Sequence, residues 1–213
     1  MSASIRDLMT DNELFGWQFG GDSWAAWRAL LAGFYGLPLD EDELALFKRI
    51  TGLPEPLQAA ALELWMVIGR RGGKSFVAAL IAVYEAAFHD YSDRLAPGEV
   101  ATILVISPDR KQSRVVMRYI RGLLHANAML KRMILREERE SIELNNRTVI
   151  EVGTASFRAV RGYSLACVVA DEIAFWRSDD SANPDHEILN ALRPAMATLN
   201  GKLIALSSPY AKR

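Results

Sequence analysis

Cysteine is almost absent from this sequence, and so are long apolar runs. The single cysteine, Cys167, excludes an intrachain disulfide and any metal cluster built on several cysteines, and it agrees with a reducing cytosol. No stretch approaches the roughly 18 uninterrupted apolar residues of a membrane helix, and residues 1–7 lack the apolar core of a signal peptide. The net charge is only −1, so no global basic field indicates a nucleic-acid partner. We therefore expect a soluble, intracellular protein without a membrane partner, in which any contact with nucleic acid depends on a local patch.

What is present is an ordinary globular composition, with 50% hydrophobic and 24% charged residues among 213. This length fits one domain with a small appendage. Asp40 and Glu43 have the spacing of a capping box at the start of a helix. Aromatic and apolar residues precede it at helical spacing, namely Trp24, Trp27, Leu31 and Phe34. The sequence thus predicts a helical N-terminal extension over residues 1–55, packed on a core formed by residues 56–213.

Strands alternate with helices in the predicted core. Apolar runs predict strands at 62–68, 100–106, 165–170 and 203–206, and helices are predicted at 76–88, 110–126 and 185–198. Asn145 and Asn146 lie between two short apolar segments and predict the turn of a β-hairpin. The alternation favours an α/β fold with a mainly parallel sheet. Polar residues directly after the strands then meet at the carboxyl edge, where open α/β sheets bind ligands.

A glycine-rich loop separates the first predicted strand from its helix, and it consists of Gly69, Arg70, Arg71, Gly72, Gly73, Lys74 and Ser75. Glycines let backbone N–H groups turn toward a phosphate, Lys74 can reach the terminal phosphates, and the Ser75 hydroxyl can hold Mg²⁺. The usual pattern G-x-x-x-x-G-K-[ST] would place its first glycine at Ile68, whereas Gly69 comes one residue later. The loop indicates a variant phosphate-binding loop for ATP and Mg²⁺; the alternative is a glycine-rich turn with a chance lysine.

Two carboxylates, Asp171 and Glu172, follow the apolar run at 165–170. An aspartate there can hold Mg²⁺ through its water shell, and a neighbouring glutamate can orient and deprotonate an attacking water. Small-molecule kinases must keep water out, so the pair favours hydrolysis over phosphoryl transfer. The alternative is an exposed acidic helix start, because acidic residues favour helix N-termini. Cys167, inside the run, is interpreted as a small core residue.

Three further sets of residues are candidates for the site or its partners. Arginines that could stabilise charge on the γ-phosphate are Arg70, Arg71, Arg158 and Arg161, of which Arg161 and Arg70 are the preferred candidates; a structural salt bridge is the alternative role of each. Ser207, Ser208 and Pro209 follow the last predicted strand, and the two serine hydroxyls could sense the γ-phosphate, although a plain turn would have the same composition. One face of the predicted helix at 110–126 carries Arg110, Arg114, Arg118 and Arg121. Most such stripes are solvated faces; the alternative is a contact with DNA or a neighbouring subunit.

The sequence resembles the N-terminal ATPase domain of the large terminase subunit of tailed bacteriophages. The resemblance depends on four motifs in this order: the glycine-rich loop, Arg161-Gly162, the acidic pair and Ser207-Ser208-Pro209. The resemblance implies a P-loop NTPase fold of the additional-strand, catalytic-glutamate type. It implies that Lys74 and Ser75 contact phosphate and Mg²⁺, that Asp171 and Glu172 occupy the metal and water positions, and that Ser207 to Pro209 form a coupling motif. Arg161 matches a finger that acts in trans on a neighbouring subunit, and Arg70 matches one that acts in cis.

The function implied by this resemblance is an ATPase motor that moves double-stranded DNA into a procapsid. The expected partners are DNA, the portal protein and the small terminase subunit, with self-association into a ring on the portal in the cytoplasm of the infected bacterial host. The family's C-terminal nuclease domain is expected to be absent from this chain. A helicase-like or other nucleic-acid-stimulated ATPase, and a nucleotide-dependent switch that barely hydrolyses ATP, are the alternatives.

Overall fold

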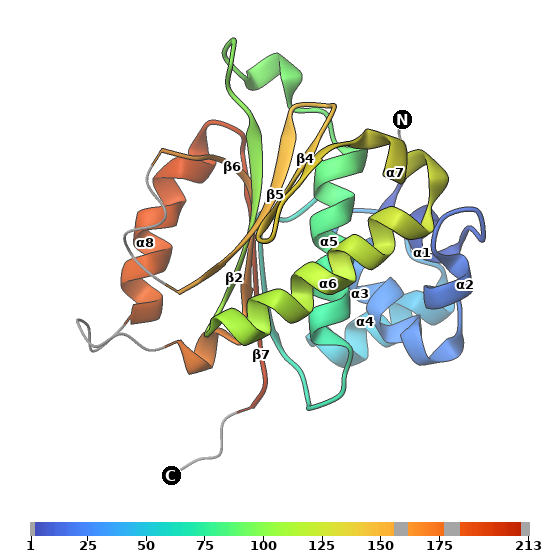
Figure 1. Cartoon of the computed structure of the whole chain (residues 1–213). Helices are drawn as coiled ribbons and strands as arrows, with labels where there is room; N and C mark the ends of the chain where they lie inside the picture. Colours follow the sequence, from blue (N-terminus) through green and yellow to red (C-terminus); the bar gives the residue numbers. More distant parts are fainter. Residues whose placement is uncertain (1–2, 156–161, 177–183, 210–213) are drawn as a thin grey trace. The chain divides into compact units, whose positions relative to one another are not determined.

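A computed structural model describes residues 3–155, 162–176 and 184–209 (Figure 1). The chain divides into two compact units, Met1–Leu62 and Glu63–Arg213. This division falls after the boundary expected at residue 55. Within the described ranges, no helix has both the length and the apolar character needed to cross a membrane.

The first unit is helical, as the sequence predicts. Its helices are α1 (Ile5–Thr10), α2 (Gly16–Phe19), η1 (Asp22–Trp24), α3 (Ala25–Phe34) and α4 (Glu41–Thr51). The predicted capping box is confirmed, because Asp40 accepts from the Glu43 backbone and the Glu43 side chain accepts from the Asp40 backbone. Trp27 and Phe34 are buried in this unit, which agrees with a packing role for these aromatic residues.

The second unit contains a seven-stranded sheet flanked by helices. Its strands are β1 (Glu63–Val67), β2 (Ala101–Ser107), β3 (Ile134–Glu137), β4 (Ser141–Leu144), β5 (Thr148–Thr154), β6 (Ser164–Asp171) and β7 (Lys202–Ser207). Its helical segments are α5 (Lys74–Phe88), η2 (Ser92–Arg94), α6 (Arg110–Ala126), α7 (Ala128–Met133), η4 (Ile173–Phe175) and α8 (Pro184–Ala197).

The sheet has the strand order β1-β7-β6-β2-β5-β4-β3. The pairs from β1 to β5 are parallel, and β5-β4 and β4-β3 are antiparallel. The prediction of a mainly parallel α/β sheet is therefore confirmed, as is the hairpin around Asn145 and Asn146. The edge strand β3 was not predicted, because it is short and three of its four residues are exposed, so it carries no apolar alternation.

Helices cover both faces of the sheet (Figure 1). α5 and α6 pack together on one face over β2, β5 and β6, and α8 packs against β6 on the other. Leu104 and Ile106 of β2 belong to the core cluster that includes Leu192 of α8. Side chains alternate along a strand, so Ile103 and Val105, which are also buried, point to the opposite face of the sheet, where α5 and α6 lie. Because β2 and β6 are buried on both faces, they are continuously apolar in sequence.

The parallel strands bring four chain segments to one edge of the sheet. β1 leads into the glycine-rich loop, β6 ends at Asp171, β7 ends at Ser207 and β2 ends at Ser107. Strand β7 lies between β1 and β6, so the residues after it stand between the phosphate loop and the acidic pair. The fold thus gathers the sequence-predicted motifs at its carboxyl edge.

Candidate nucleotide-binding site

The glycine-rich loop ends in the N-terminus of α5, a helix of 15 residues. Gly73 adopts a left-handed conformation (φ 83°) directly before this helix. A Cβ at Gly72 would lie 2.6 Å from Cγ2 of Ile68, whereas a Cβ at Gly69 would meet nothing within 4 Å. The loop therefore needs glycine at 72 and 73 for its own backbone. It lines a cavity of about 660 Å³, which is also lined by Glu172, directly after β6, and by Ser208 and Pro209, directly after β7.

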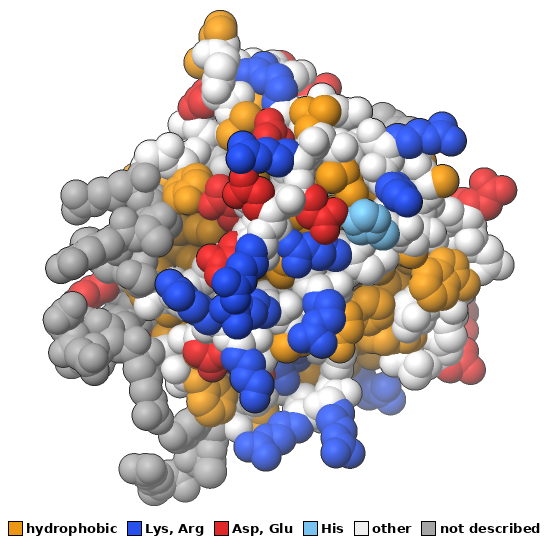
Figure 2. Space-filling model, viewed as in Figure 1, with side chains coloured by type: hydrophobic (Ala, Val, Ile, Leu, Met, Phe, Trp, Pro, Cys, Tyr) orange, Lys and Arg blue, Asp and Glu red, His pale blue; other side chains and the backbone are white. Residues whose placement is uncertain are grey.

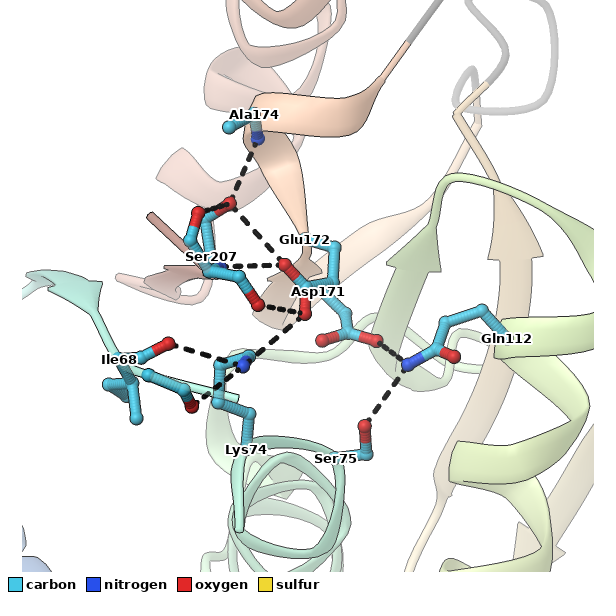
Figure 3. Close-up of polar contacts among 10 residues, drawn as sticks. Ile68, Lys74, Ser75, Gln112, Asp171, Glu172, Ala174 and Ser207 are labelled. Carbon is cyan, nitrogen blue, oxygen red and sulfur yellow. Dashed lines mark hydrogen bonds and ion pairs between the residues drawn. The ribbon is translucent and has the colours of Figure 1, made fainter. Parts of the chain in front are cut away.

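Lys74, the first residue of α5, is buried and points to the carboxyl edge (Figure 3). Its ammonium group lies 3.3 Å from the carbonyl oxygen of Ile68, 3.4 Å from that of Gly69, and 3.4 Å from Oε1 of Glu172. The lysine is thus held beside the loop by neutral carbonyls and one carboxylate. A phosphate in the cavity would compete with these oxygens for the same cation.

Asp171 is the last residue of β6, and its side chain is fully buried. Its Oδ2 accepts a hydrogen bond of 2.9 Å from the Gln112 side-chain amide, and its Oδ1 has no hydrogen-bond partner among the described residues. Burial and the neighbouring Glu172 raise the pKa of Asp171 to about 6, although Gln112 and Lys74 act to lower it. A buried carboxylate with an open coordination position is the kind of group that a cation would stabilise.

Glu172 adopts a left-handed backbone conformation, with φ 49° and ψ 45°. This conformation is uncommon for a residue with a side chain and is associated with functional sites. Its Oε2 accepts a hydrogen bond of 2.7 Å from the Ser208 backbone, and its Oε1 accepts one of 2.8 Å from the Ser208 hydroxyl. Burial acts to raise the pKa of Glu172, but the Ser208 hydrogen bonds and Lys74 outweigh it and lower the pKa.

The structure brings Ser207 and Ser208 to the acidic pair, where the sequence argument placed them only after a strand. The Ser207 hydroxyl donates to Oε2 of Glu172 at 3.5 Å and accepts from the Ala174 backbone at 3.3 Å (Figure 3). Pro209 lines the same cavity. These contacts join the end of β7 to the segment after its neighbouring strand β6.

Gln112 is a site residue that the sequence argument missed. It lies in the first turn of α6, where Asp109 caps the helix by accepting from the backbones of Lys111 and Gln112. The Gln112 side-chain nitrogen donates to Ser75 Oγ at 3.1 Å and to Asp171 Oδ2 at 2.9 Å (Figure 3). The position of Gln112 in the sequence could have indicated this role. The helix α6 begins three residues after the carboxyl end of the central strand β2, so its first turn faces the edge of the sheet where ligands bind.

The candidate arginines fall into different environments. Arg70 and Arg71 are exposed and line the cavity, whereas Arg158 and Arg161 lie outside the described residues. Neither finger assignment is therefore tested by the geometry.

The arginine stripe is confirmed as one face of α6, with Val116, Ile120 and Leu123 buried on the opposite side. Arg121 differs from the other three, because it pairs with Glu137 at 2.8 Å and donates to backbone oxygens of Glu138 and Arg139. The remaining members of the stripe, Arg110, Arg114 and Arg118, are exposed and form no ion pair with any residue in the described ranges. Figure 2 shows Lys and Arg side chains gathered on this face of the molecule, beside a group of acidic ones.

The residues present fit a magnesium–nucleotide site. Among the described residues there is no group of three or more His, Cys, Asp and Glu side chains suited to a metal. Mg²⁺ in nucleotide sites keeps waters and phosphate oxygens and uses only one or two protein ligands, so a dedicated cluster is not needed. Ser75 Oγ and Asp171 Oδ2 both contact the Gln112 amide, and Asp171 Oδ1 lacks a partner in the described part of the chain. This donor set suits a hard cation bound together with phosphate.

The fold and the arrangement of its edge define a class: a P-loop NTPase fold of the additional-strand, catalytic-glutamate type. β7 is the additional strand between the phosphate loop and the acidic pair, and Glu172 follows the aspartate of β6. No family model and no curated protein matches the sequence.

Solved structures place the fold more narrowly, as that of the ATPase domain of phage large terminases. The chain is similar to the ATPase domain of the Thermus phage P74-26 large terminase (TM-score 0.56, 16% identity) and to a mutant of that domain (0.55, 15%), covering 91% of this chain and 71% of each of those. It is also similar to the HK97 bacteriophage large terminase (TM-score 0.54, 17% identity), covering 85% of this chain. The chain spans 37% of the length of the HK97 protein.

Proposed function

We propose that this chain is the ATPase motor domain of a viral large terminase subunit, which couples ATP hydrolysis to movement of double-stranded DNA. The observation that carries the proposal is that Lys74, Ser75 and Glu172 line one cavity at the phosphate loop, with the buried Asp171 joined to Ser75 through Gln112. The fold likeness to large terminase ATPase domains supports the same function.

The phosphate loop binds the substrate ATP. The N–H groups at the start of α5 and the ammonium group of Lys74 would hold the phosphates, because both present positive charge to the cavity. Lys74 would exchange its contact with Glu172, now 3.4 Å, for the phosphate oxygens. Ser75 and Asp171 would hold Mg²⁺, which neutralises charge on the phosphates when it is bound.

Glu172 acts as the general base in this proposal. Its lowered pKa keeps it ionised at neutral pH, as a base requires. In the described structure both carboxylate oxygens accept hydrogen bonds from Ser208, and the exchange of Lys74 from Glu172 to the phosphates would leave an acceptor position of Oε1 to a water. Ser208 therefore links the base to β7, which supports a coupling role for Ser207, Ser208 and Pro209.

An arginine is proposed to stabilise charge on the γ-phosphate during hydrolysis. Arg70 lies in the loop beside the cavity and would act in cis. Arg161 would act in trans, from a neighbouring subunit.

The remaining partners belong to the whole protein and follow from the terminase proposal. They are DNA, the portal protein and the small terminase subunit, with self-association into a ring in the cytoplasm of the infected bacterial host. Arg110, Arg114 and Arg118 are the proposed contact with DNA or a neighbouring subunit. Arg121 is the fourth proposed member of this set, and in the described structure it also pairs with Glu137.

Steady-state ATP turnover of Glu172→Gln and Glu172→Ala tests the proposal. We expect each to lower turnover by about 100-fold or more, because a positioned general base contributes at least that much. ATP binding should persist in both. Glu187→Gln, which removes an exposed acid of α8, is the matched control and should leave turnover unchanged. Wild-type turnover in both Glu172 variants would contradict the assignment.

Mixing variants separates the two arginine assignments. Arg161→Ala subunits are mixed with Glu172→Ala subunits under conditions in which assembly is demonstrated. If Arg161 acts in trans, some turnover should return in the mixture, because one subunit supplies the arginine and its neighbour the glutamate. Absence of recovery favours the finger in cis, for which Arg70→Ala is the corresponding test.

A further inference from the structure

Gln112 joins the two groups that the proposed function assigns to the metal. One side-chain nitrogen lies 3.1 Å from Ser75 Oγ and 2.9 Å from Asp171 Oδ2. We propose that Gln112 is a positioning residue that holds Ser75 and Asp171 at the spacing required for Mg²⁺. This inference rests on the proposed ATPase function and adds to it a residue that none of the sequence motifs contains.

The chemistry of the amide suits this role. A side-chain NH₂ group has two donors and a partial positive charge but no net charge, so it can bond both oxygens from one point. Both acceptors therefore lie within about 6 Å of each other, because the two hydrogen bonds share one nitrogen. Two oxygens that close to each other would both be placed to hold one hard cation, which favours oxygen ligands.

The surroundings keep Gln112 in place. Asp109 caps the first turn of α6 by accepting from the Lys111 and Gln112 backbones, and Ser113 donates to the Asp109 carbonyl oxygen at 3.0 Å. Ser75 belongs to α5 and Asp171 to β6, so the three side chains come from three separate elements. Fixing such groups in advance reduces the ordering that binding would otherwise require.

The Gln112 contacts also matter to the protein without metal. Asp171 is fully buried, and Gln112 donates a 2.9 Å hydrogen bond to its carboxylate. The amide therefore compensates part of the cost of a buried charge. A residue that only connected α6 to the sheet would also compensate this buried charge, but its removal would not alter the response of the protein to Mg²⁺. The response to Mg²⁺ therefore distinguishes a positioning role from a purely structural one.

The first measurement is the affinity of the protein for a fluorescent ATP analogue, in Mg²⁺ and in EDTA. The Mg²⁺ enhancement is defined as the dissociation constant in EDTA divided by the dissociation constant in Mg²⁺. We expect Gln112→Ala to reduce this enhancement by about tenfold, in the range found for residues that orient metal ligands, and to leave the EDTA affinity within about twofold. Lys111→Ala, an exposed neighbour on the same turn, is the control and should retain the wild-type ratio.

The second measurement uses Gln112→Glu and needs no nucleotide. The new carboxylate would lie beside Asp171 and close to Glu172, so the melting temperature without divalent metal should fall below that of the wild type. Mg²⁺ or Mn²⁺ alone should then raise it by more than in the wild type, because the added carboxylate is an oxygen ligand.

The outcomes separate this inference from the proposed function. An unchanged Mg²⁺ enhancement in Gln112→Ala, or an equal loss of affinity with and without Mg²⁺, would overturn the positioning role. So would a metal response of Gln112→Glu no larger than that of the wild type. If the wild type binds no nucleotide under either condition, the ATPase proposal itself fails.

Discussion

Two clusters of charged side chains lie at opposite ends of the same two elements, α5 and β7. At the carboxyl edge, Lys74 begins α5 and Ser207 ends β7, beside Asp171 and Glu172. At the other end, Glu85 near the end of α5 meets Lys202, the first residue of β7. Both clusters bury carboxylates, so the difference between them concerns how fully those carboxylates are satisfied.

In the cluster around Glu85 the carboxylate is complete, because each of its oxygens has a partner. The Glu85 side chain is fully buried, yet its Oε2 accepts a 2.7 Å hydrogen bond from the Tyr91 hydroxyl and its Oε1 lies 3.5 Å from the Lys202 ammonium group. Burial and Glu85 hold the pKa of Tyr91 well above its usual value, so this hydroxyl remains a donor. Burial likewise raises the pKa of Cys167, which agrees with its predicted role as an unreactive core residue.

The carboxyl edge, in contrast, is incomplete. Asp171 has an oxygen without a hydrogen bond among the described residues, and Glu172 has a left-handed backbone. The comparison indicates that one cluster serves stability and the other retains unfavourable features that a ligand would relieve. Removal of the buried carboxylate of each cluster should therefore change stability in opposite directions.

The largest effect is expected at the complete cluster, from Glu85→Ala. This change leaves Lys202 largely buried without its carboxylate, and removing one partner of a buried pair costs about 3–5 kcal/mol. Urea unfolding should show a loss of this size. Asp93→Ala, which removes an exposed acid nearby in the sequence, should change stability little. A loss for Glu85→Ala as small as that of the control would remove the distinction between the clusters.

The next effect has the opposite sign and comes from Asp171→Asn. The asparagine oxygen can still accept from Gln112, but no buried charge remains, so the nucleotide-free protein should gain about 1–3 kcal/mol at pH 7.5. The pKa of Asp171, about 6, lies above the unfolded value of 3.8, so the native state binds this proton more tightly. The gain should therefore be complete above about pH 6 and vanish as the pH falls toward 3.8. A gain that persists at pH 4 would contradict this explanation.

A smaller effect is expected from Ser208→Ala. The variant loses the 2.8 Å hydroxyl contact to Glu172 and keeps the backbone bond, so the nucleotide-free protein should lose about 1–2 kcal/mol. Ser207→Ala removes only long contacts, at 3.5 Å to Glu172 and at 3.3 Å to the backbones of Ala174 and Ser208, so this matched variant should lose less. Thermal unfolding of both proteins measures the difference, and equal losses would show that Ser208 does not hold Glu172 specifically.

The smallest effect concerns the response to acid. Burial, opposed by Glu85, lowers the pKa of His89 from its usual 6.5, so the unfolded state binds this proton first as the pH falls. His89 therefore destabilises the protein on acidification through pH 6.5, whereas Asp171 stabilises it over the same range. Stability profiles of His89→Gln and Asp171→Asn from pH 8 to pH 5 should deviate from the wild type in opposite directions. Deviations of the same sign would contradict the comparison.

The sequence was sufficient for most of the fold, because long apolar or amphipathic segments carry strong periodic signals. The predicted helix at 110–126 coincides with α6, and the buried strands β2 and β6 were found from their continuous apolar character. β3 was missed, because exposed residues in a short edge strand carry no such signal.

The site was only partly predictable, because chemistry-bearing motifs are local and contacts between them are not. The phosphate loop and the acidic pair are contiguous in sequence, so their composition revealed them. Gln112 lies 37 positions from Ser75 and 59 from Asp171, and only the packing of α6 brings its amide to both. The same holds for Ser208, whose role as partner of Glu172 depends on the order of strands in the sheet.

The open space around Gly69 has a consequence for how relatives of this protein are recognised. No atom of the described structure within 4 Å requires residue 69 to lack a side chain, whereas Ile68 restricts residue 72 and a positive φ restricts residue 73. The protein atoms around the loop therefore allow a side chain at residue 69 and disfavour one at residues 72 and 73. A search pattern anchored on the first glycine would pass over this chain, and one anchored on the glycine pair, lysine and serine would retain it.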